Sequence, residues 1–268
     1  SYRPGGQGAN TNGVNYDKYF HYDEETSDGF ELGVKSSLME RKLQLNFAVF
    51  YQKFSGYQAL SSQIAMRTDL TGQALKGLGG FVTNSKAEAK GVEIGFAYAF
   101  PYRIVFNFDA SYAQTTWADG VVRPVSMKDA AGQYVFNTPG EYISYANVGG
   151  QRIGNAPDLT LTPRLEWTRR AGRNEVFARG LMKYQSDRIL ISNVRQETLG
   201  GYALCDLQVG LRSGNGNWDV TLWGKNVLGR EAVDYFEDPQ ATFIWTSGFR
   251  QVVTTNPTEV GLTVSRRF

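Results

Sequence analysis

The chain is poor in the two side chains that most often carry metal or nucleophile chemistry, with one cysteine and one histidine. A single cysteine excludes an internal disulfide and a thiolate metal cluster. Cys205 alternates with Ala203 and Leu207, so we expect a small buried or lipid-facing residue on an apolar strand face. A serine–histidine–aspartate site would have to use His21. His21 lies in an aromatic segment with no nucleophile motif nearby, and we therefore expect no catalytic residue.

Charge is also nearly balanced, with a formal net charge of +2 and no stripe of lysine and arginine. This pattern predicts no nucleic-acid partner. The acidic residues between Asp17 and Asp28 match no calcium-loop spacing, and we interpret them as a solvated loop. No glycine-rich phosphate loop follows a strand and opens a helix. We expect no metal and no cofactor.

Long apolar runs are missing as well. No run approaches the roughly 18–20 residues of a membrane helix, and the mean hydropathy is −0.36. This excludes a helical membrane protein but not a β-barrel, whose alternating lipid-facing and lumen-facing residues average to a polar composition. The start, Ser1–Gly6, lacks the charged and apolar regions of a signal peptide. An exported protein would thus be represented here by a mature or trimmed chain.

What the sequence has instead is apolar alternation with a period of two residues, in nine segments. Its 30 glycines and its many aromatic residues also favour strands and turns. The expected strands are 29–38, 43–57, 81–100, 103–117, 158–168, 175–186, 200–212, 218–228 and 257–268.

The links between these strands alternate between short and long. The short links are 39–42, 101–102, 169–174 and 213–217, and the long links are 58–80, 118–157, 187–199 and 229–256. An antiparallel up-and-down meander with tight turns on one side only is typical of transmembrane β-barrels. A soluble sandwich would have mostly short links at both ends.

Strand length supports the same fold class. Five apolar residues at period two, as in Leu43–Tyr51, cover about 9–10 residues, which crosses the hydrocarbon core at ~45° tilt. Alternation alone does not distinguish lipid from a protein core. Several expected strands exceed the usual length in soluble sheets, which favours a barrel in a membrane.

Four stretches resemble the C-terminal barrel portion of TonB-dependent outer-membrane receptors. They are Arg3–Gly6 with Glu24-Glu25 and Phe30–Lys35; Thr83–Glu93; Gly154–Asp158; and Lys225–Leu228 followed by a last strand ending at Phe268. They are similar to that family's "RPGG … ELG.K", "N.g.a…GvE", "NAP" and "kNlfd" stretches. The resemblance covers nearly the whole chain.

The resemblance implies that 1–268 is the C-terminal part of a 22-stranded barrel, with the plug domain and the earlier strands absent. An odd number of strands cannot close an even-stranded bacterial barrel, which agrees with this interpretation. The family's proteins are monomeric barrels in outer-membrane lipid that import scarce ligands, and they contact TonB through the plug. We therefore expect a bacterial outer-membrane protein with a periplasmic C-terminus, and the resemblance implies a ferric siderophore or similar iron chelate as its ligand.

The last strand resembles the signal read by the barrel assembly machinery. Its residues Gly261, Val264 and Phe268 are the expected elements of that signal, and Arg266 departs from it because the position is usually apolar.

Ligand contacts are expected on the long links, where aromatic rings and arginines can stack on and hydrogen-bond an extracellular small molecule. The candidates are Tyr16, Tyr19, His21, Tyr22, Tyr142, Tyr145, Arg152, Tyr235, Phe236, Trp245 and Arg250. The alternative is that these side chains pack the links against each other or anchor them at the interface.

Rival functions remain open at this point. A porin-like passive channel would conduct without TonB, and a soluble β-rich binding domain would need no detergent. TonB-dependent uptake of a glycan or cobalamin would change only the ligand. An outer-membrane enzyme would lose hydrolysis in His21→Ala.

Overall fold

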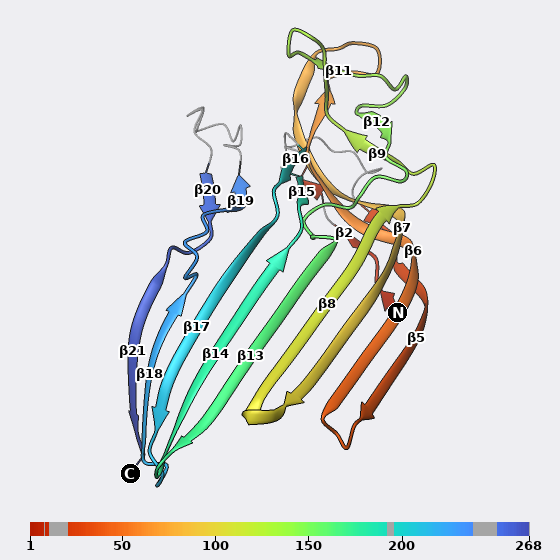
Figure 1. The fold of residues 1–268 in the computed structure, drawn as a ribbon. Coiled ribbons are helices and arrows are strands. Elements are labelled where there is room, and N and C mark those ends of the chain that lie inside the picture. The colour runs from red at the N-terminus through yellow and green to blue at the C-terminus, as the bar shows by residue number, and fades with distance from the viewer. Residues whose placement is uncertain (8, 11–20, 192–195, 238–250, 268) are drawn as a thin grey trace.

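In a computed structural model, which describes residues 1–7, 9–10, 21–191, 196–237 and 251–267, the chain forms one large antiparallel sheet. Nine long strands lie side by side in it (Figure 1), as the alternation predicted. They are β5 (Glu25–Leu38), β6 (Leu43–Arg67), β7 (Leu75–Phe100), β8 (Ile104–Trp117), β13 (Leu159–Ala171), β14 (Asn174–Gln185), β17 (Tyr202–Arg212), β18 (Trp218–Lys225) and β21 (Glu259–Arg266).

Each long strand pairs with the next long strand along the chain, so the all-β up-and-down order is confirmed. Two short N-terminal strands join the sheet, β1 (Tyr2–Arg3) at the edge of β5 and β3 (Ala9–Asn10) on β7. One short link holds a 3-10 turn, η2 (Pro101–Arg103). In Figure 1 the short links and the C-terminus lie at one end of the sheet, and the long links lie at the other. No helix in the part of the chain that the structure describes is long and apolar enough to span a membrane.

The two faces of the sheet differ in polarity because the strand register keeps the alternation in phase. One row of paired residues is apolar and reads Trp167, Ala178, Val209, Leu222, Leu262 across five strands. The adjacent row, on the other face, reads Glu166, Arg179, Gln208, Trp223, Gly261. Leu262 is 65% exposed, so no second layer formed by the described residues covers the apolar face there. Cys205 pairs with Met182 and lies on this apolar face.

One predicted link is wrong. Residues 58–80 do not form a long loop, because β6 runs on to Arg67 and β7 begins at Leu75. The pairing continues through register shifts, the first of them between Phe54 and Tyr57. Gly56 lies in this bulge with φ +68°, a conformation suited to glycine. The alternation could not show this, because each bulge shifts the apolar period by one residue.

The other long links, and the N-terminal segment before β5, hold small two-stranded elements at the long-link end of the sheet (Figure 1). These pair β2 (Gly6–Gln7) with β4 (His21–Tyr22), β9 (Val122–Val125) with β12 (Ser144–Asn147), β10 (Met127–Lys128) with β11 (Tyr134–Val135), β15 (Arg188–Ile191) with β16 (Gln196–Leu199), and β19 (Val233–Glu237) with β20 (Gln251–Thr254).

The asparagines of the motifs hold strand ends together. Asn84 donates from Nδ2 to the carbonyl oxygens of Gly56 and Asp23, and its Oδ1 accepts from the Asp23 amide. Asn226 is buried, and its Nδ2 donates to the carbonyls of Arg230 and Asn256. Buried amide side chains need such partners. Asn84 therefore ties β7 to the segment before β5 and to the bulge of β6. Asn226 fixes the point where the chain turns from β18 toward β21.

Candidate functional site

Link 118–157 packs against the extended β6–β7 hairpin at the long-link end. Ile64 and Met66 of β6, Phe81 of β7 and Ile143 of the link form a buried apolar cluster, and Tyr145 packs against it. Ile143 is completely buried. The cluster is the larger of two buried apolar clusters among the described residues, and it lies at the long-link end of the sheet. The link is thus held to the hairpin by a shared apolar core.

Arg67, at the end of β6, fastens the same link. Its side chain is buried and donates from Nε to the Glu141 carbonyl at 2.8 Å and from Nη2 to the Thr138 carbonyl at 3.3 Å. Its guanidinium also lies 5.9 Å from the centre of the Phe136 ring. Three backbone carbonyls, counting that of Gly72, accept from this one side chain. The cation therefore satisfies link backbone groups that would otherwise be buried without a partner.

The link lies on the polar side of the sheet. On β7, Glu93 lies on the polar face. Phe81 and Thr83 lie on the same face, because they are an even number of residues from Glu93 and the bulge in this stretch is on β6, not on β7. Trp117 pairs with Ala87 on that side. In a closed barrel the polar face is the inner one. Link 118–157 therefore leans over the inner side of the wall.

Arg123 of β9 joins this inner layer to the wall. Its guanidinium lies 4.1 Å from the Trp117 ring centre, and Nη2 donates to Ser61 Oγ at 2.9 Å and to Thr83 Oγ1 at 3.1 Å. Burial lowers the pKa of Arg123 to about 10. The group stays protonated at neutral pH, so it contributes a fixed positive charge beneath the link.

A cavity of about 230 Å³ opens where the N-terminal segment, β7 and the link meet. It is lined by His21, Phe81, Val82, Thr83, Asn84, Ser85, Val122, Pro124 and Tyr145. The lining combines an imidazole, a phenol, hydroxyls and apolar side chains. Such a lining can stack on a ring and hydrogen-bond its substituents, as small-molecule sites do. It contains no paired acid and base that would support catalysis.

A second cluster joins the hairpins of the two later links. Leu190 of β15, Leu199 of β16 and Phe236 of β19 are buried together. Arg188 Nη2 and the Tyr202 hydroxyl both donate to Asp234 Oδ1 at 2.8 Å. Arg188 also donates to the Asp234 carbonyl. These hydrogen bonds hold the pKa of the Asp234 carboxyl below its usual value of 3.8.

We expect the docking of β19 on β15 to weaken only at acidic pH, where the Asp234 carboxylate becomes protonated. Because the pKa of Asp234 is lowered by folding, its contribution is fully present above pH 3.8 and is lost as the pH falls through the lowered pKa. Amide exchange of 233–236, corrected for intrinsic rate, should therefore be as slow at pH 5 as at pH 7 and faster below pH 3.8. Asp234→Asn should be less protected at pH 5 and show no further acid step. An acid step of the same size in the variant would contradict this assignment.

Arg152 forms ion pairs at the rim. Its Nη2 lies 3.0 Å from Asp158 Oδ1 and its Nη1 lies 3.1 Å from Asp187 Oδ2. Residue 152 also bridges Thr116 of β8. The side chain thus links the ends of β8, β13 and β14, and its charge is already matched by two carboxylates.

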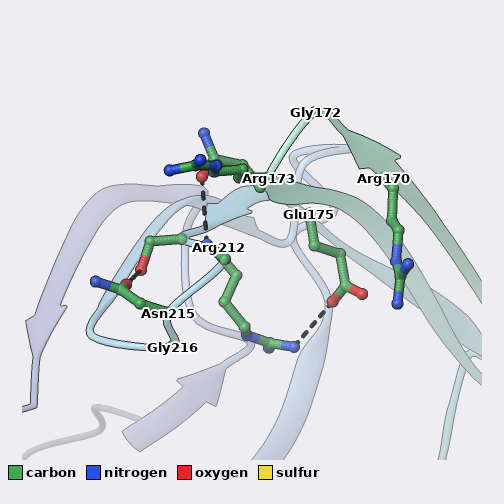
Figure 2. A pocket seen from close by; sticks show the side chains of 10 residues that line it. Arg170, Gly172, Arg173, Glu175, Arg212, Asn215 and Gly216 are labelled. Carbon is green, nitrogen blue, oxygen red and sulfur yellow. Dashed lines mark hydrogen bonds and ion pairs between the residues drawn. The ribbon is translucent and has the colours of Figure 1, made fainter.

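The short-link end has a hollow of about 830 Å³ between links 172–173 and 213–217. Figure 2 shows Arg212 pointing to Glu175, with which it forms an ion pair at 3.0 Å, while Arg170 and Arg173 lie apart from that pair. Arg212 Nε also contacts Asp219 Oδ2 at 3.3 Å. The hollow is polar and basic, and it faces away from the cavity at the long-link end.

In the residues that the structure describes, no group of three or more His, Cys, Asp or Glu side chains could hold a metal ion.

The structure brings together only some of the predicted ligand contacts. His21 and Tyr145 line the cavity. Tyr142 is not among the lining residues, and its carbonyl accepts from the Arg67 amide. Phe236 is buried with the second cluster, whereas Tyr235 is 45% exposed. Tyr22 lies on β4 against Gly6, outside the cavity lining. Tyr16, Tyr19, Trp245, Arg250 and Phe268 lie outside the described residues.

The lining residues that sequence reasoning missed are mainly on β7. Thr83, Asn84 and Ser85 fall in a segment that the alternation assigns to the barrel wall. The available signal was length, because strand 81–100 is far longer than the about 9–11 residues that cross a bilayer. A strand of that length in a barrel would extend beyond the bilayer, and its first residues would be free to line a site.

The comparisons with known proteins agree with this architecture. A family model described as "TonB dependent receptor-like, beta-barrel" matches residues 1–227. No curated protein matches the chain.

Solved structures match over nearly the whole chain at low sequence identity. The ferric yersiniabactin uptake receptor FyuA from Yersinia pestis is 15% identical with a TM-score of 0.66, covering 100% of this chain and 33% of its own. The ferric-catecholate import receptor Fiu from K12 E. coli is 17% identical with a TM-score of 0.57, covering 99% and 30%. The copper transporter OprC is 13% identical with a TM-score of 0.57, covering 92% and 32%. The chain thus spans about a third of the structures that it matches, and the likeness shows a shared fold.

Proposed function

Because the chain belongs to the family of TonB-dependent receptor β-barrels, we propose that it is the C-terminal part of an outer-membrane receptor that imports a ferric siderophore or similar iron chelate. The family is one of outer-membrane transporters and receptors, not enzymes. Import would draw on TonB through a plug domain.

The observation that carries this proposal is the inward position of link 118–157. The link leans over the polar face of the sheet, held by Arg67 and by the cluster around Ile143. Between it and the wall lies the cavity lined by His21 and Tyr145. A cavity on the inner side of the wall lies on the route that a ligand would take into a barrel.

The ligand class is supported by the names of similar structures. FyuA is named for ferric yersiniabactin and Fiu for ferric catecholates, whereas OprC is named for copper. Rings and hydroxyls around the cavity suit a phenolate or catecholate chelate better than a bare ion.

The same proposal fixes an orientation. The long links would be extracellular, and the short links and the C-terminus would be periplasmic. Val264 lies on the apolar face and is 55% exposed, and Gly261 lies against the Trp223 ring. With Phe268 these residues would form the strand that the assembly machinery reads, in a barrel that is monomeric when complete.

We expect His21→Ala in the full-length receptor to slow uptake of its ferric chelate about tenfold, since a lost aromatic contact is worth about 0.5–1.5 kcal/mol. Tyr134→Ala is the control, because Tyr134 is an aromatic residue of link 118–157 that contacts Lys128 and is not in the cavity lining. The measurement is ⁵⁵Fe uptake from catecholate, phenolate and hydroxamate chelates by a strain with this receptor as its only importer. Equal uptake by both variants would refute the cavity as the ligand site.

Uptake measurements in the same strain also distinguish the proposed function from a porin-like channel and from uptake of another ligand. Uptake should vanish without TonB; uptake that persists, with single-channel conductance of the purified receptor, would indicate a porin-like channel. Uptake of cobalamin or a glycan with no ferric chelate transported would keep the class and change the ligand.

A further inference from the structure

A largely buried cation next to the cavity has no carboxylate partner. Within the described residues, the guanidinium of Arg123 donates only to the hydroxyl groups of Ser61 and Thr83, and it lies over the Trp117 ring. Its pKa responds to burial and to Tyr57, and no carboxylate of the described residues acts on it. Burying a charge is costly unless an opposite charge accompanies it. Arg123 therefore contributes a positive charge that the surrounding side chains do not balance.

Arg123 also leaves hydrogen-bond donors unused, in contrast with Arg67 and Arg188. Arg67 donates from all three guanidinium nitrogens to carbonyl oxygens, and Arg188 donates to the Asp234 carboxylate. In Arg123 the Nε atom is buried without an acceptor, and Nη1, which is not fully buried, donates to no described residue. Native structures seldom leave such groups unpaired. Holding the link in place does not explain these donors, because both hydrogen bonds to the wall come from Nη2.

Arg123 lies one side chain behind the wall of the cavity. Thr83 lines the cavity, and its Oγ1 accepts from Arg123 Nη2 at 3.1 Å. Val122 and Pro124, the neighbours of Arg123 on β9, line the cavity too. None of the nine lining residues carries a carboxylate, an ammonium or a guanidinium group. The charge of Arg123 is therefore supplied from directly behind a lining that has no such group of its own.

Aromatic rings keep water away from this charge. Trp117, which the guanidinium covers, is only 4% exposed. The Tyr57 ring packs edge-on against Trp117, with the ring centroids 5.7 Å apart. A charge among rings is screened less than a charge in water, so its field extends further. A negatively charged group in the cavity would be attracted by Arg123, whereas a neutral group would gain little.

We propose that Arg123 is a specificity-determining residue of the cavity, which selects chelates that bring a negatively charged oxygen to the Thr83 side over neutral chelates. A ferric tris-catecholate is negatively charged, whereas a ferric tris-hydroxamate is neutral, because three hydroxamates together only balance the charge of Fe³⁺. The inference rests on the proposed function. It narrows the ligand from ferric chelates in general to anionic ones.

The test measures binding of two hexadentate ferric chelates, a tris-catecholate and a tris-hydroxamate, to the full-length receptor in detergent by titration calorimetry. We expect the wild type to bind the tris-catecholate more tightly. Arg123→Gln should weaken that binding about tenfold, the size expected for unit charges roughly 10 Å apart at an effective dielectric constant of about 20. Affinity for the tris-hydroxamate should not change. Arg123→Lys keeps the charge and should keep the preference.

Lys128→Gln is the matched control, because it removes a cation of the same link that lies 4.7 Å from the Tyr134 ring centre and outside the cavity lining. It should leave both affinities unchanged. Equal weakening of both chelates in Arg123→Gln would show that Arg123 only holds the link, and it would overturn the inference while the proposed function stands. Unchanged tris-catecholate affinity in that variant, or a wild-type preference for the tris-hydroxamate, would also overturn it. Binding of neither chelate by the wild type would refute the proposed function itself.

Discussion

Gly91→Ala should cut the fraction of correctly assembled receptor about tenfold, the largest effect that we expect from a single added methyl group in this chain. A Cβ at Gly91 would collide with the Tyr112 carbonyl oxygen and would lie 2.6 Å from Phe50 Cζ. The ring could rotate, but the carbonyl belongs to the ladder between β7 and β8 and cannot move alone. Overpacking of this kind costs about 1–3 kcal/mol.

Gly91 is one of three glycines on the polar face that face an aromatic ring across the ladder. Phe50 pairs with Gly91, Phe177 with Gly210 and Trp223 with Gly261. In each pair a Cβ on the glycine would collide with the ring. The rings lie over bare backbone and fill the gap that the missing side chain leaves, an arrangement known to stabilise strand glycines.

The three sites should differ in cost because the obstructing atoms differ. At Gly210 the nearest atoms are of the Phe177 ring, with the Val220 carbonyl oxygen at 2.9 Å, and at Gly261 they are all of Trp223. The order of damage should thus be Gly91, Gly210, Gly261. Phe177→Ala should partly rescue Gly210→Ala, whereas Phe50→Ala should not rescue Gly91→Ala.

Gly200→Ala is the matched control, since no atom lies within 4 Å of its ideal Cβ and its φ is not positive. It should be neutral or slightly stabilising. The folded fraction is read from heat-modifiable migration of full-length receptor in membranes. Equal damage at all four glycines would show that backbone freedom, and not contact with the rings, is what these positions require.

Arg67→Met should release link 118–157 from the β6–β7 hairpin while leaving the sheet intact. The methionine keeps an apolar stem but leaves the carbonyls of Glu141, Thr138 and Gly72 without their donor. A hydrogen bond to a charged group is worth about 1.5–3 kcal/mol, so docking should weaken by about 3 kcal/mol. Amides of 134–147 should exchange about a hundredfold faster.

Hydrogen exchange of the full-length receptor, resolved by peptide, is the measurement. Lys128→Met is the control, because Lys128 lies in the same link and only covers the Tyr134 ring at its surface. Amides of β13 and β14 should be unchanged in both variants. Unchanged exchange of 134–147 in Arg67→Met would mean that the Ile143 cluster alone holds the link. If the cavity is the ligand site, the variant should also lose uptake.

Much of the architecture could be predicted because alternation is a local property. The row from Trp167 to Leu262 needs only every second residue to be apolar. Each short link makes the two strands that it joins pair with each other. The number and order of the long strands were therefore correct. Prediction was wrong at 58–80, where bulges near Gly56 and Ser61 interrupt the period although the hairpin continues.

The candidate site was less predictable, because burial of a link aromatic depends on residues far away in the sequence. Phe236 and Tyr235 are neighbours in the sequence, yet Phe236 is buried against Leu190 and Leu199 while Tyr235 is exposed. Arg152 was predicted as a ligand contact, and in the structure it forms ion pairs with Asp158 and Asp187, which the sequence did not indicate. Composition shows that such groups are present on the links and cannot show which of them pair with each other.

The sequence by itself determined the strands, the two faces and the family, because period-two alternation, turn residues and short motifs are encoded within a few neighbouring positions. Only the tertiary structure decided how far β6 and β7 rise above the rest of the sheet, which side link 118–157 covers, and where Arg123 lies relative to the cavity. These depend on contacts such as Arg67 with Glu141 and Arg123 with Ser61, which join residues more than forty positions apart.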